Sequence, residues 1–139
     1  MAVYHRDFEI GTTKENDIVD ITGEVGRVVK ESGLTEGIVS VFVSGSTGAI
    51  TTLEYEPGLL EDMPEAMETI APRDKVYQHH LRWHDGNGHS HVRASIMGPG
   101  MTVPFRDGQL LLGTWQQIVF IEMDVKPRNR QIRVQIVGE

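Results

Sequence analysis

The sequence predicts an α+β fold, built mainly as an antiparallel β-sandwich with two helices in a single domain over residues 1–139. Runs rich in β-branched and aromatic residues fill much of the chain, and short turns join most of them, which favours antiparallel pairing. Only two segments space their apolar residues by three and four positions, as a helix does. The length of 139 residues supports one hydrophobic core, and no low-complexity linker divides the chain.

The first helix is expected over residues 22–32, with Asp20 or Thr22 as its cap. Gly33 then suits the left-handed position that ends many helices. A second helix is expected over residues 59–70, where early acidic residues favour the positive end of the helix dipole and a proline follows the last turn. The apolar residues at helical spacing in these two segments are Val25, Val28, Val29, Leu60, Met63, Met67 and Ile70.

Strands are expected to form the rest of the regular structure, and from His89 onward every element is interpreted as a strand. Asp107 and Gly108 are typical of a two-residue hairpin turn, and residues 126–129 supply the turn before the last strand. The expected strands cover residues 3–10, 37–43, 49–55, 89–97, 102–106, 109–112, 115–124 and 131–137.

Composition and charge narrow the classes of function. The net charge of −7 opposes binding to a nucleic acid, and no apolar run approaches the length of about 20 residues that a membrane helix needs. The N-terminal segment carries charged residues where a secretory signal has its apolar region, so we expect a cytoplasmic protein. A basic cluster is interpreted as a solvated hairpin tip in preference to a phosphate-binding patch: Lys126, Arg128, Arg130 and Arg133.

All but one of the six histidines lie between residues 77 and 124. His89 and His91 would point to the same face of a strand, because side chains two residues apart share a face. A loop could return His79 to this pair, and three imidazoles with an open fourth position form the arrangement of a catalytic zinc site. The chain has no cysteine, so the pattern points to a divalent metal, zinc or magnesium, held without thiolates, and indicates no organic cofactor. The alternative is that these histidines lie at the surface or form hydrogen bonds in the core.

Polar residues next to the predicted strands are candidate ligands for a substrate. Residues 44–48 include Ser46 and Thr47, whose hydroxyls and neighbouring backbone N–H groups could cradle a phosphate. A plain turn is favoured over this cradle, because no helix follows the segment. Asn87 lies beside the histidines, and Arg106 has the chemistry of a phosphate partner.

Two carboxylates and the segment from Trp115 complete the candidate site. Burial in an apolar strand would raise the pKa of Glu54 or Glu122 and suit either one to general acid–base work. We assign Glu54 and His91 to catalysis, while for Glu122 a contact between strands or subunits is equally consistent. Trp115 could stack on a heteroaromatic ring whose edge Gln116 binds, although a tryptophan at a strand start more often packs in a core or an interface.

Two segments, Asn87-Gly-His-Ser-His91 and Gly113-Thr-Trp-Gln-Gln-Ile118, resemble the signature of the YjbQ-like family. The resemblance extends over residues 22–138. It implies a YjbQ-like domain, a β-sandwich with two helices that assembles as a homotrimer, and a secondary thiamine-phosphate synthase activity. The residues that match positions typical of the family are Glu54, His79, His91 and Glu122.

The chain departs from the family after its predicted strand over residues 37–43. Many relatives carry a His-Thr-Thr-like run there, whereas this chain has Gly45, Ser46 and Thr47. A histidine that could bind a ligand or a metal is therefore missing. His89, which not every relative shares, could compensate for it.

Three functions remain open on the sequence. The resemblance implies a transferase that joins a pyrimidine diphosphate to a thiazole phosphate with loss of diphosphate, and hence a small phosphorylated molecule as partner. The histidines also fit a metal-dependent hydrolase with Glu54 as its base. The third function is a non-catalytic trimeric protein that binds a metal or an anion.

Overall fold

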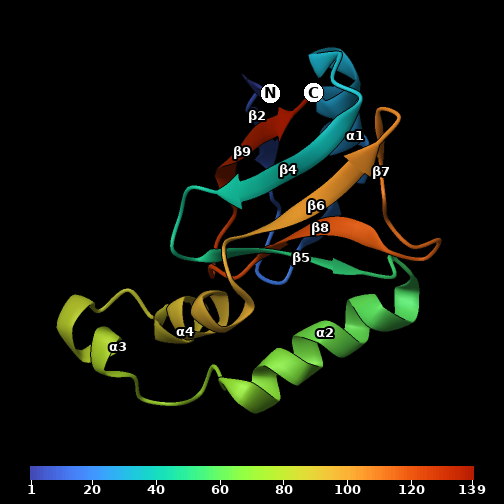
Figure 1. Cartoon of the computed structure of the whole chain (residues 1–139). Helices are drawn as coiled ribbons and strands as arrows, with labels where there is room; N and C mark the ends of the chain where they lie inside the picture. Colours follow the sequence, from blue (N-terminus) through green and yellow to red (C-terminus); the bar gives the residue numbers. More distant parts are fainter.

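Two antiparallel sheets stack face to face in the computed structural model, which describes residues 1–139 (Figure 1). The larger sheet has the order β1-β9-β4-β6-β7, with β2 also pairing with β9, and the smaller sheet has the order β3-β8-β5. The strands of the larger sheet are β1 (Ala2–His5), β2 (Phe8–Gly11), β4 (Glu36–Val43), β6 (Gly100–Arg106), β7 (Gln109–Leu110) and β9 (Asn129–Gly138). Those of the smaller sheet are β3 (Ile18–Asp20), β5 (Gly48–Leu53) and β8 (Gln117–Glu122). The predicted antiparallel α+β sandwich is confirmed.

The strand with the most partners in the larger sheet is β9, which pairs with β1, β2 and β4. Its first half pairs with β2 and its second half with β1, while β4 pairs along its other edge. The single strand predicted over residues 3–10 is therefore two strands, which are separated at Arg6 and Asp7.

Alternating residues of β4 divide the larger sheet into a buried and an exposed face. Val39, Val41 and Val43 are fully buried and pack with β9, with the smaller sheet and with α1 (Thr22–Ser32). Ile38 and Phe42 stand at the alternate positions, point to the other face and are 50% and 44% exposed. No element of the chain covers this outer face of β4.

Two turn predictions from the sequence are confirmed. Gly33 follows α1 with a φ of 71°, the left-handed conformation expected at the end of that helix. Asp107 and Gly108 join β6 to β7 with φ values of 53° and 69°, and positive φ at both residues is the signature of a type I′ hairpin.

α2 (Pro57–Ile70) and α4 (Gly88–Met97) cover the face of the smaller sheet that is turned away from the larger sheet (Figure 1). Their contact with the sheet forms a second core, in which Met67 of α2 and Ala94 of α4 pack with Val119 of β8. The predicted second helix is thus confirmed, and the smaller sheet is buried on both faces.

The strand predicted over residues 89–97 is wrong, because these residues form α4, and a short helix, α3 (Gln78–Trp83), precedes it. The fold therefore has four helices instead of the two expected from the sequence. The residues of α4 that point to the core follow helical spacing. Most of them are small or polar, so the sequence has no apolar pattern that would predict a helix. They are Ser90, Arg93, Ala94 and Met97.

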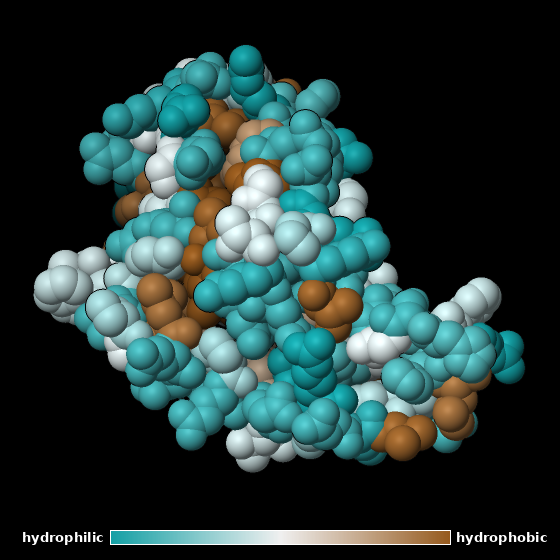
Figure 2. Space-filling view, turned by 180° about the vertical axis from the view of Figure 1, so that it is seen from behind, coloured by the Kyte–Doolittle hydropathy of each residue, from teal (hydrophilic) through white to brown (hydrophobic).

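Hydrophobic side chains also reach the surface near α3. Figure 2 shows hydrophobic patches between hydrophilic residues, one of them at the end of the molecule that carries α3. In that region Val76 and Leu81 are 67% and 55% exposed. None of the helices has the length and apolar character needed to cross a membrane. The cytoplasmic location expected from the sequence stays a prediction.

Candidate functional site

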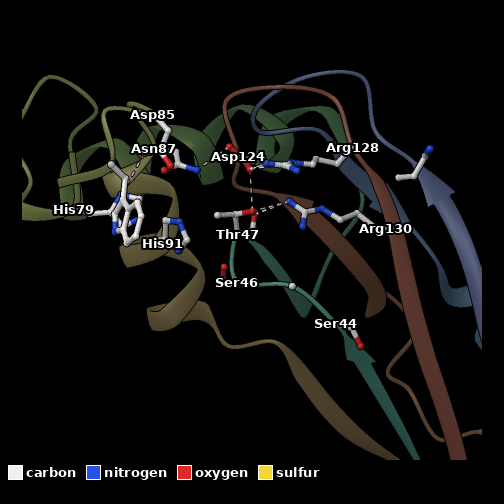
Figure 3. Close-up of a pocket in the computed structure, with 13 residues that line it drawn as sticks. Ser44, Ser46, Thr47, His79, Asp85, Asn87, His91, Asp124, Arg128 and Arg130 are labelled. Atoms are coloured by element: carbon white, nitrogen blue, oxygen red, sulfur yellow. Dashed lines mark hydrogen bonds and ion pairs between the residues drawn. The ribbon is translucent and has the colours of Figure 1, made fainter. Parts of the chain in front are cut away.

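A pocket of about 610 Å³ opens where three connections of the fold meet, and we call it the polar pocket. The β4–β5 connection contributes residues Ser44, Gly45, Ser46 and Thr47. The segment that leads from β8 into β9 contributes Asp124, Arg128, Asn129 and Arg130. The third group comes from α3, α4 and the turn between them: His79, Trp83, Asp85, Asn87 and His91. Figure 3 shows the two histidines on one side of the pocket and the arginines on the other.

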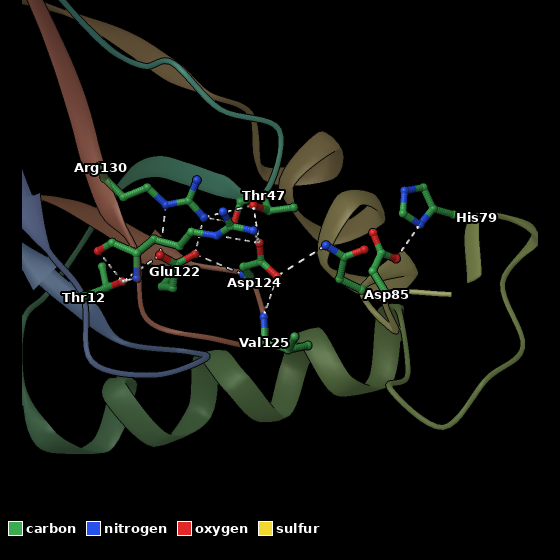
Figure 4. A network of polar contacts seen from close by, with 10 residues as sticks. Thr12, Thr47, His79, Asp85, Glu122, Asp124, Val125 and Arg130 are labelled. Atoms are coloured by element: carbon green, nitrogen blue, oxygen red, sulfur yellow. Dashed lines mark hydrogen bonds and ion pairs between the residues drawn. The ribbon is translucent and has the colours of Figure 1, made fainter. Parts of the chain in front are cut away.

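A buried ion pair between Arg130 and Glu122 joins the two sheets beside the polar pocket (Figure 4). Arg130 lies on β9 and is 6% exposed, and Glu122 ends β8 and is fully buried. The Arg130 Nε–H donates to Glu122 Oε1 at 2.9 Å, and Nη2 donates to Glu122 Oε2 and to the Thr47 hydroxyl and carbonyl. The Thr12 hydroxyl donates to the same carboxylate at 2.7 Å. Glu122 is therefore a structural counter-charge for Arg130.

Asp124 is the carboxylate that lines the polar pocket beside this ion pair. Its Oδ2 accepts from Arg128 Nε at 3.0 Å and Nη2 at 2.7 Å, and from the Thr47 hydroxyl at 3.1 Å. Its Oδ1 accepts from the Val125 N–H at 2.8 Å. Burial alone would raise the pKa of Asp124, but these hydrogen bonds, with one from Asn87, together lower it below its usual value. Asp124 is thus ionised at neutral pH and holds Arg128 in place.

The opposite wall of the pocket carries a pair of imidazoles. The ring centroids of His79 and His91 are 4.4 Å apart, with 39° between the ring planes. Burial lowers the pKa of His91, and the neighbouring His79 lowers it further. His79 Nδ1 lies 3.4 Å from Asp85 Oδ1 and is buried without a hydrogen bond. At neutral pH the pair therefore offers a neutral imidazole that can accept a proton.

Asn87 connects the two walls of the pocket. It precedes α4, is 7% exposed and lies between the carboxylates of Asp85 and Asp124. Its amide nitrogen donates to Asp124 Oδ1 at 3.4 Å in one orientation, and to Asp85 Oδ1 at 2.8 Å in the flipped one. Because an amide has its donors on one side only, its oxygen faces a carboxylate in either orientation. The shorter of these hydrogen bonds joins Asn87 to Asp85, so Asn87 holds the turn between α3 and α4 at the edge of the pocket.

The polar pocket contains five of the residues proposed from the sequence. They are Ser46, Thr47, His79, Asn87 and His91. In the segment over residues 44–48, for which a plain turn was favoured, residues 44–47 form a bend that also lines the pocket, and Gly48 begins β5. The sequence thus located one histidine wall and one hydroxyl-bearing loop of the same cavity.

The structure does not bring His89 to the other two proposed metal ligands. Residues two apart on a helix point to different sides, and His89 is turned into the protein, where its Nε2 lies 2.5 Å from Glu15 Oε1. As the side chains stand, no group of three His, Asp or Glu residues could hold a metal ion. Asp124, a further carboxylate in the pocket, already accepts hydrogen bonds on both oxygens. The divalent metal stays a prediction, with His79 and His91 as the two imidazole donors that lie together.

Four other proposed site residues lie outside the polar pocket. Glu54 follows β5, whereas the pocket lies before that strand, and the length of a six-residue strand, about 20 Å, separates the two ends. Arg106 is exposed, and its Nε lies 3.8 Å from Glu36 Oε2. Trp115 is 72% exposed, and Gln116 Nε2 donates to the hydroxyl of Thr52 on β5 at 3.1 Å.

The pocket residues that the sequence did not reveal are chiefly the two arginines. The interpretation of their segment as a solvated tip is wrong for Arg130, which is buried, and for Arg128, which lines the pocket. A signal was present, because Arg130 is two residues before Ile132 and therefore on the buried face of β9. Trp83, which the sequence analysis did not single out, lines the pocket with the histidines and is 66% exposed.

The fold and the pocket define a class of protein: a small α+β sandwich with one polar pocket of the size that binds a metabolite. The profile of the family described as UPF0047 protein YjbQ-like matches residues 6–139. The chain belongs to this YjbQ/UPF0047 family, which confirms the resemblance found in the sequence.

Relatives of the chain match it over nearly its full length. A UPF0047 protein of Methanothermobacter thermautotrophicus is 41% identical over 139 residues, which are 100% of this chain and 95% of that protein. The UPF0047 protein YugU of Bacillus subtilis is 33% identical over 134 residues, covering 96% of this chain and 98% of YugU. A crystal structure of a YbjQ-like protein of unknown function from Sulfolobus solfataricus has a TM-score of 0.93 and 37% identity, and the match covers 99% of each chain.

Proposed function

We propose that this YjbQ/UPF0047 protein binds a small phosphorylated molecule in the polar pocket, and that the His79–His91 pair exchanges protons with it during a group transfer. One observation carries the proposal: a single pocket of about 610 Å³ holds an imidazole pair on one wall and guanidinium and hydroxyl groups on the other. Guanidinium and hydroxyl groups bind phosphate oxygens, and imidazoles exchange protons near neutral pH. The volume lies within the range of about 300–1,000 Å³ that is typical of small-molecule sites.

Trp83 favours a ligand with a heteroaromatic ring. Its side chain is 66% exposed and lines the same pocket as the imidazole pair. An aromatic ring of a ligand can stack on this exposed indole without displacing protein groups. Such stacking contributes about 0.5–1.5 kcal/mol of binding free energy beyond the contribution of the buried area. A phosphorylated pyrimidine or thiazole has both the ring and the anion that this pocket would contact.

The reaction that these features fit is the thiamine-phosphate synthase reaction, in which a pyrimidine diphosphate joins a thiazole phosphate and diphosphate departs. The departing group gains negative charge as its bond breaks, and donors aimed at its oxygens lower the barrier. In this chain an imidazole N–H of the pair and the Arg128 guanidinium are candidates for such donors. A hydrolase with Glu54 as base is less well supported, because Glu54 follows β5 and the pocket precedes it.

The test is an assay of thiamine phosphate formation with purified protein, with Mg²⁺ and with Zn²⁺, together with elemental analysis for bound metal. His91→Asn removes the group with the lowered pKa, and we expect a loss of about 10²-fold or more in kcat. His80→Asn changes an exposed histidine on α3 outside the pocket and serves as the matched control. Ligand binding without turnover in any of these assays would support the non-catalytic function instead. Failure to bind any phosphorylated compound would remove the proposal.

The homotrimer also remains a proposal. The outer face of the larger sheet exposes Val3, Ile38 and Phe42, and burying such side chains against a second copy would stabilise an assembly. Light scattering coupled to gel filtration gives the mass of the assembly. A mass of one chain at micromolar concentration would contradict the trimer.

A further inference from the structure

We propose that Arg130 Nη1 anchors the phosphate group of the ligand in the polar pocket, and that Gly45 keeps this donor accessible. The inference rests on the proposed function, because it names the contact by which the same pocket holds its phosphorylated ligand. It assigns a binding role to a buried arginine and a selective role to a glycine.

The Arg130 guanidinium is held rigidly by protein groups on most sides. Its Nε and Nη2 are bound to Glu122 and Thr47, and its Cζ lies 5.7 Å from the centre of the Phe120 ring. Only Nη1 has no hydrogen-bond partner in the chain, while Arg130 itself is 94% buried and lines the polar pocket. Figure 4 shows the hydrogen bonds on two of the guanidinium nitrogens and none on the third. Because the guanidinium is planar and held by its other nitrogens, the direction of the Nη1–H bonds is fixed in advance.

Gly45 is the residue that leaves room beside this nitrogen. A Cβ atom at position 45 would lie 2.9 Å from Arg130 Nη1, closer than carbon and nitrogen normally approach. The arginine could not easily move away, since Glu122 and Thr47 hold it. The backbone does not require glycine, because Gly45 is not among the residues with positive φ. The main effect of having glycine at position 45 is therefore that Arg130 Nη1 stays accessible from the pocket.

The charges around Arg130 indicate the class of group that would bind. Glu122 neutralises the charge of Arg130. Nη1 would therefore contribute to binding mainly as an oriented hydrogen-bond donor, and less through long-range attraction of the anion. Arg128, which is paired with Asp124, adds a second guanidinium to the same pocket, and His79 and His91 line the opposite wall. Ser46, next to Gly45, lines the same space with an exposed hydroxyl that has no partner in the chain. Donors that approach from several sides match a tetrahedral oxyanion, which points to a phosphate monoester or a terminal phosphate.

The experiment compares the binding of inorganic phosphate to the wild type, Gly45→Ala and Gly113→Ala by calorimetry. The new methyl group in Gly45→Ala would fill the space next to Nη1, and we expect its Kd to rise about tenfold or more, the loss of one charge-assisted hydrogen bond. Gly113→Ala is the matched control, since its Cβ would meet only Gln116 at 3.6 Å, outside the pocket. We expect the control to bind phosphate as the wild type does.

The outcomes separate this inference from the proposed function. Equal Kd values for the wild type and for folded Gly45→Ala would overturn the role of Arg130 and Gly45 but leave the ligand class standing. A wild type that binds no phosphate or phosphorylated compound would overturn both. If Gly45→Ala does not fold, the arginine Nε–H resonances of the wild type are followed during a phosphate titration, with Arg128→Lys used for assignment. A shift of the Arg130 resonance would support the inference, and its invariance at saturation would overturn it.

Discussion

Glu122 illustrates how one residue serves both the fold and the site. Its carboxylate is fully buried and neutralises Arg130 between the two sheets. Glu122→Gln would leave a buried guanidinium without its counter-charge, and we expect a loss of about 3–5 kcal/mol in the free energy of unfolding, measured with urea. Asp7→Asn breaks the exposed pair with Arg133, and a change of less than about 1 kcal/mol is expected for this control. Similar losses in both variants would contradict the structural role of Glu122.

The imidazole pair should make anion binding depend on pH. Burial and His79 lower the pKa of His91, so at neutral pH this ring is mainly uncharged and becomes cationic only as the pH falls. Sulfate keeps its charge over this range, so its affinity should rise several-fold between about pH 8 and about pH 5.5 as the protein gains positive charge. In His91→Asn most of this dependence should disappear, whereas His80→Asn, on the exposed side of α3, should retain it. Calorimetric titration with sulfate at a series of pH values gives the result.

Among the elements, α4 shows where the sequence misleads and why. His89 and His91 are two residues apart, and on a strand they would point to the same face. The segment is instead a helix, and its buried residues follow helical spacing. The side chains that carry the helical spacing include Ser90 and Arg93, which contribute no hydrophobic signal. Arg93 is buried only because its Nε–H donates to the Ala71 carbonyl and Nη2 to Glu68, partners that no local pattern reveals.

The same helix permits a test of buried polarity. The Ser90 hydroxyl is fully buried and has no hydrogen-bond partner, which costs about 1–3 kcal/mol relative to a satisfied group. Ser90→Ala should therefore raise the free energy of unfolding by about 1 kcal/mol, to which the higher helix propensity of alanine contributes. Ser95→Ala, at an exposed position of α4, gains from propensity alone and is the matched control. A stabilisation no larger than that of the control would show that Ser90 has a partner in solution.

The sequence predicted only part of the candidate site, because some of its residues lie in short distinctive segments and others lie on regular strands. Residues Ser46, Thr47, His79 and His91 belong to short segments whose composition is unusual, so the sequence alone draws attention to them. Arg130 belongs to a regular strand, and its role arises only because β8 and β9 come from different sheets and place Glu122 opposite it. Residues whose partners lie in another sheet are difficult to recognise before the topology is known.

At the scale of the whole molecule, acid should weaken the fold in two stages. Burial holds the pKa of His91 below its ordinary value of 6.5, so the unfolded chain takes up a proton first and stability falls as the pH drops below that value. The pKa of Asp124 is also lowered, from 3.8, so the stability that it contributes is complete above that value and is lost as the pH falls through the folded-state pKa. Urea midpoints measured from about pH 8 to about pH 3 should show both declines. His91→Asn should lack the first decline and keep the second.

The sequence predicts the type of fold better than it predicts the order of the strands in the sheets. The turns at Gly33 and at Asp107–Gly108 and the β-branched run of residues 37–43 each follow from local chemistry, and together they predict an antiparallel sandwich. The order of the strands does not follow from local chemistry. Nothing in residues 129–138 shows that this strand pairs with β1 and β2 along one edge and with β4 along the other.

The position of β9 between β4 and the pair β1 and β2 has a consequence for how the protein is made. A ribosome releases β1, β2 and β4 long before residues 129–138, so the strands on either side of β9 must wait for it with their edges unpaired. The valines of β4 that β9 later helps to bury stay exposed during this interval. The growing chain therefore passes through a stage in which unpaired strand edges and apolar side chains favour association with other chains.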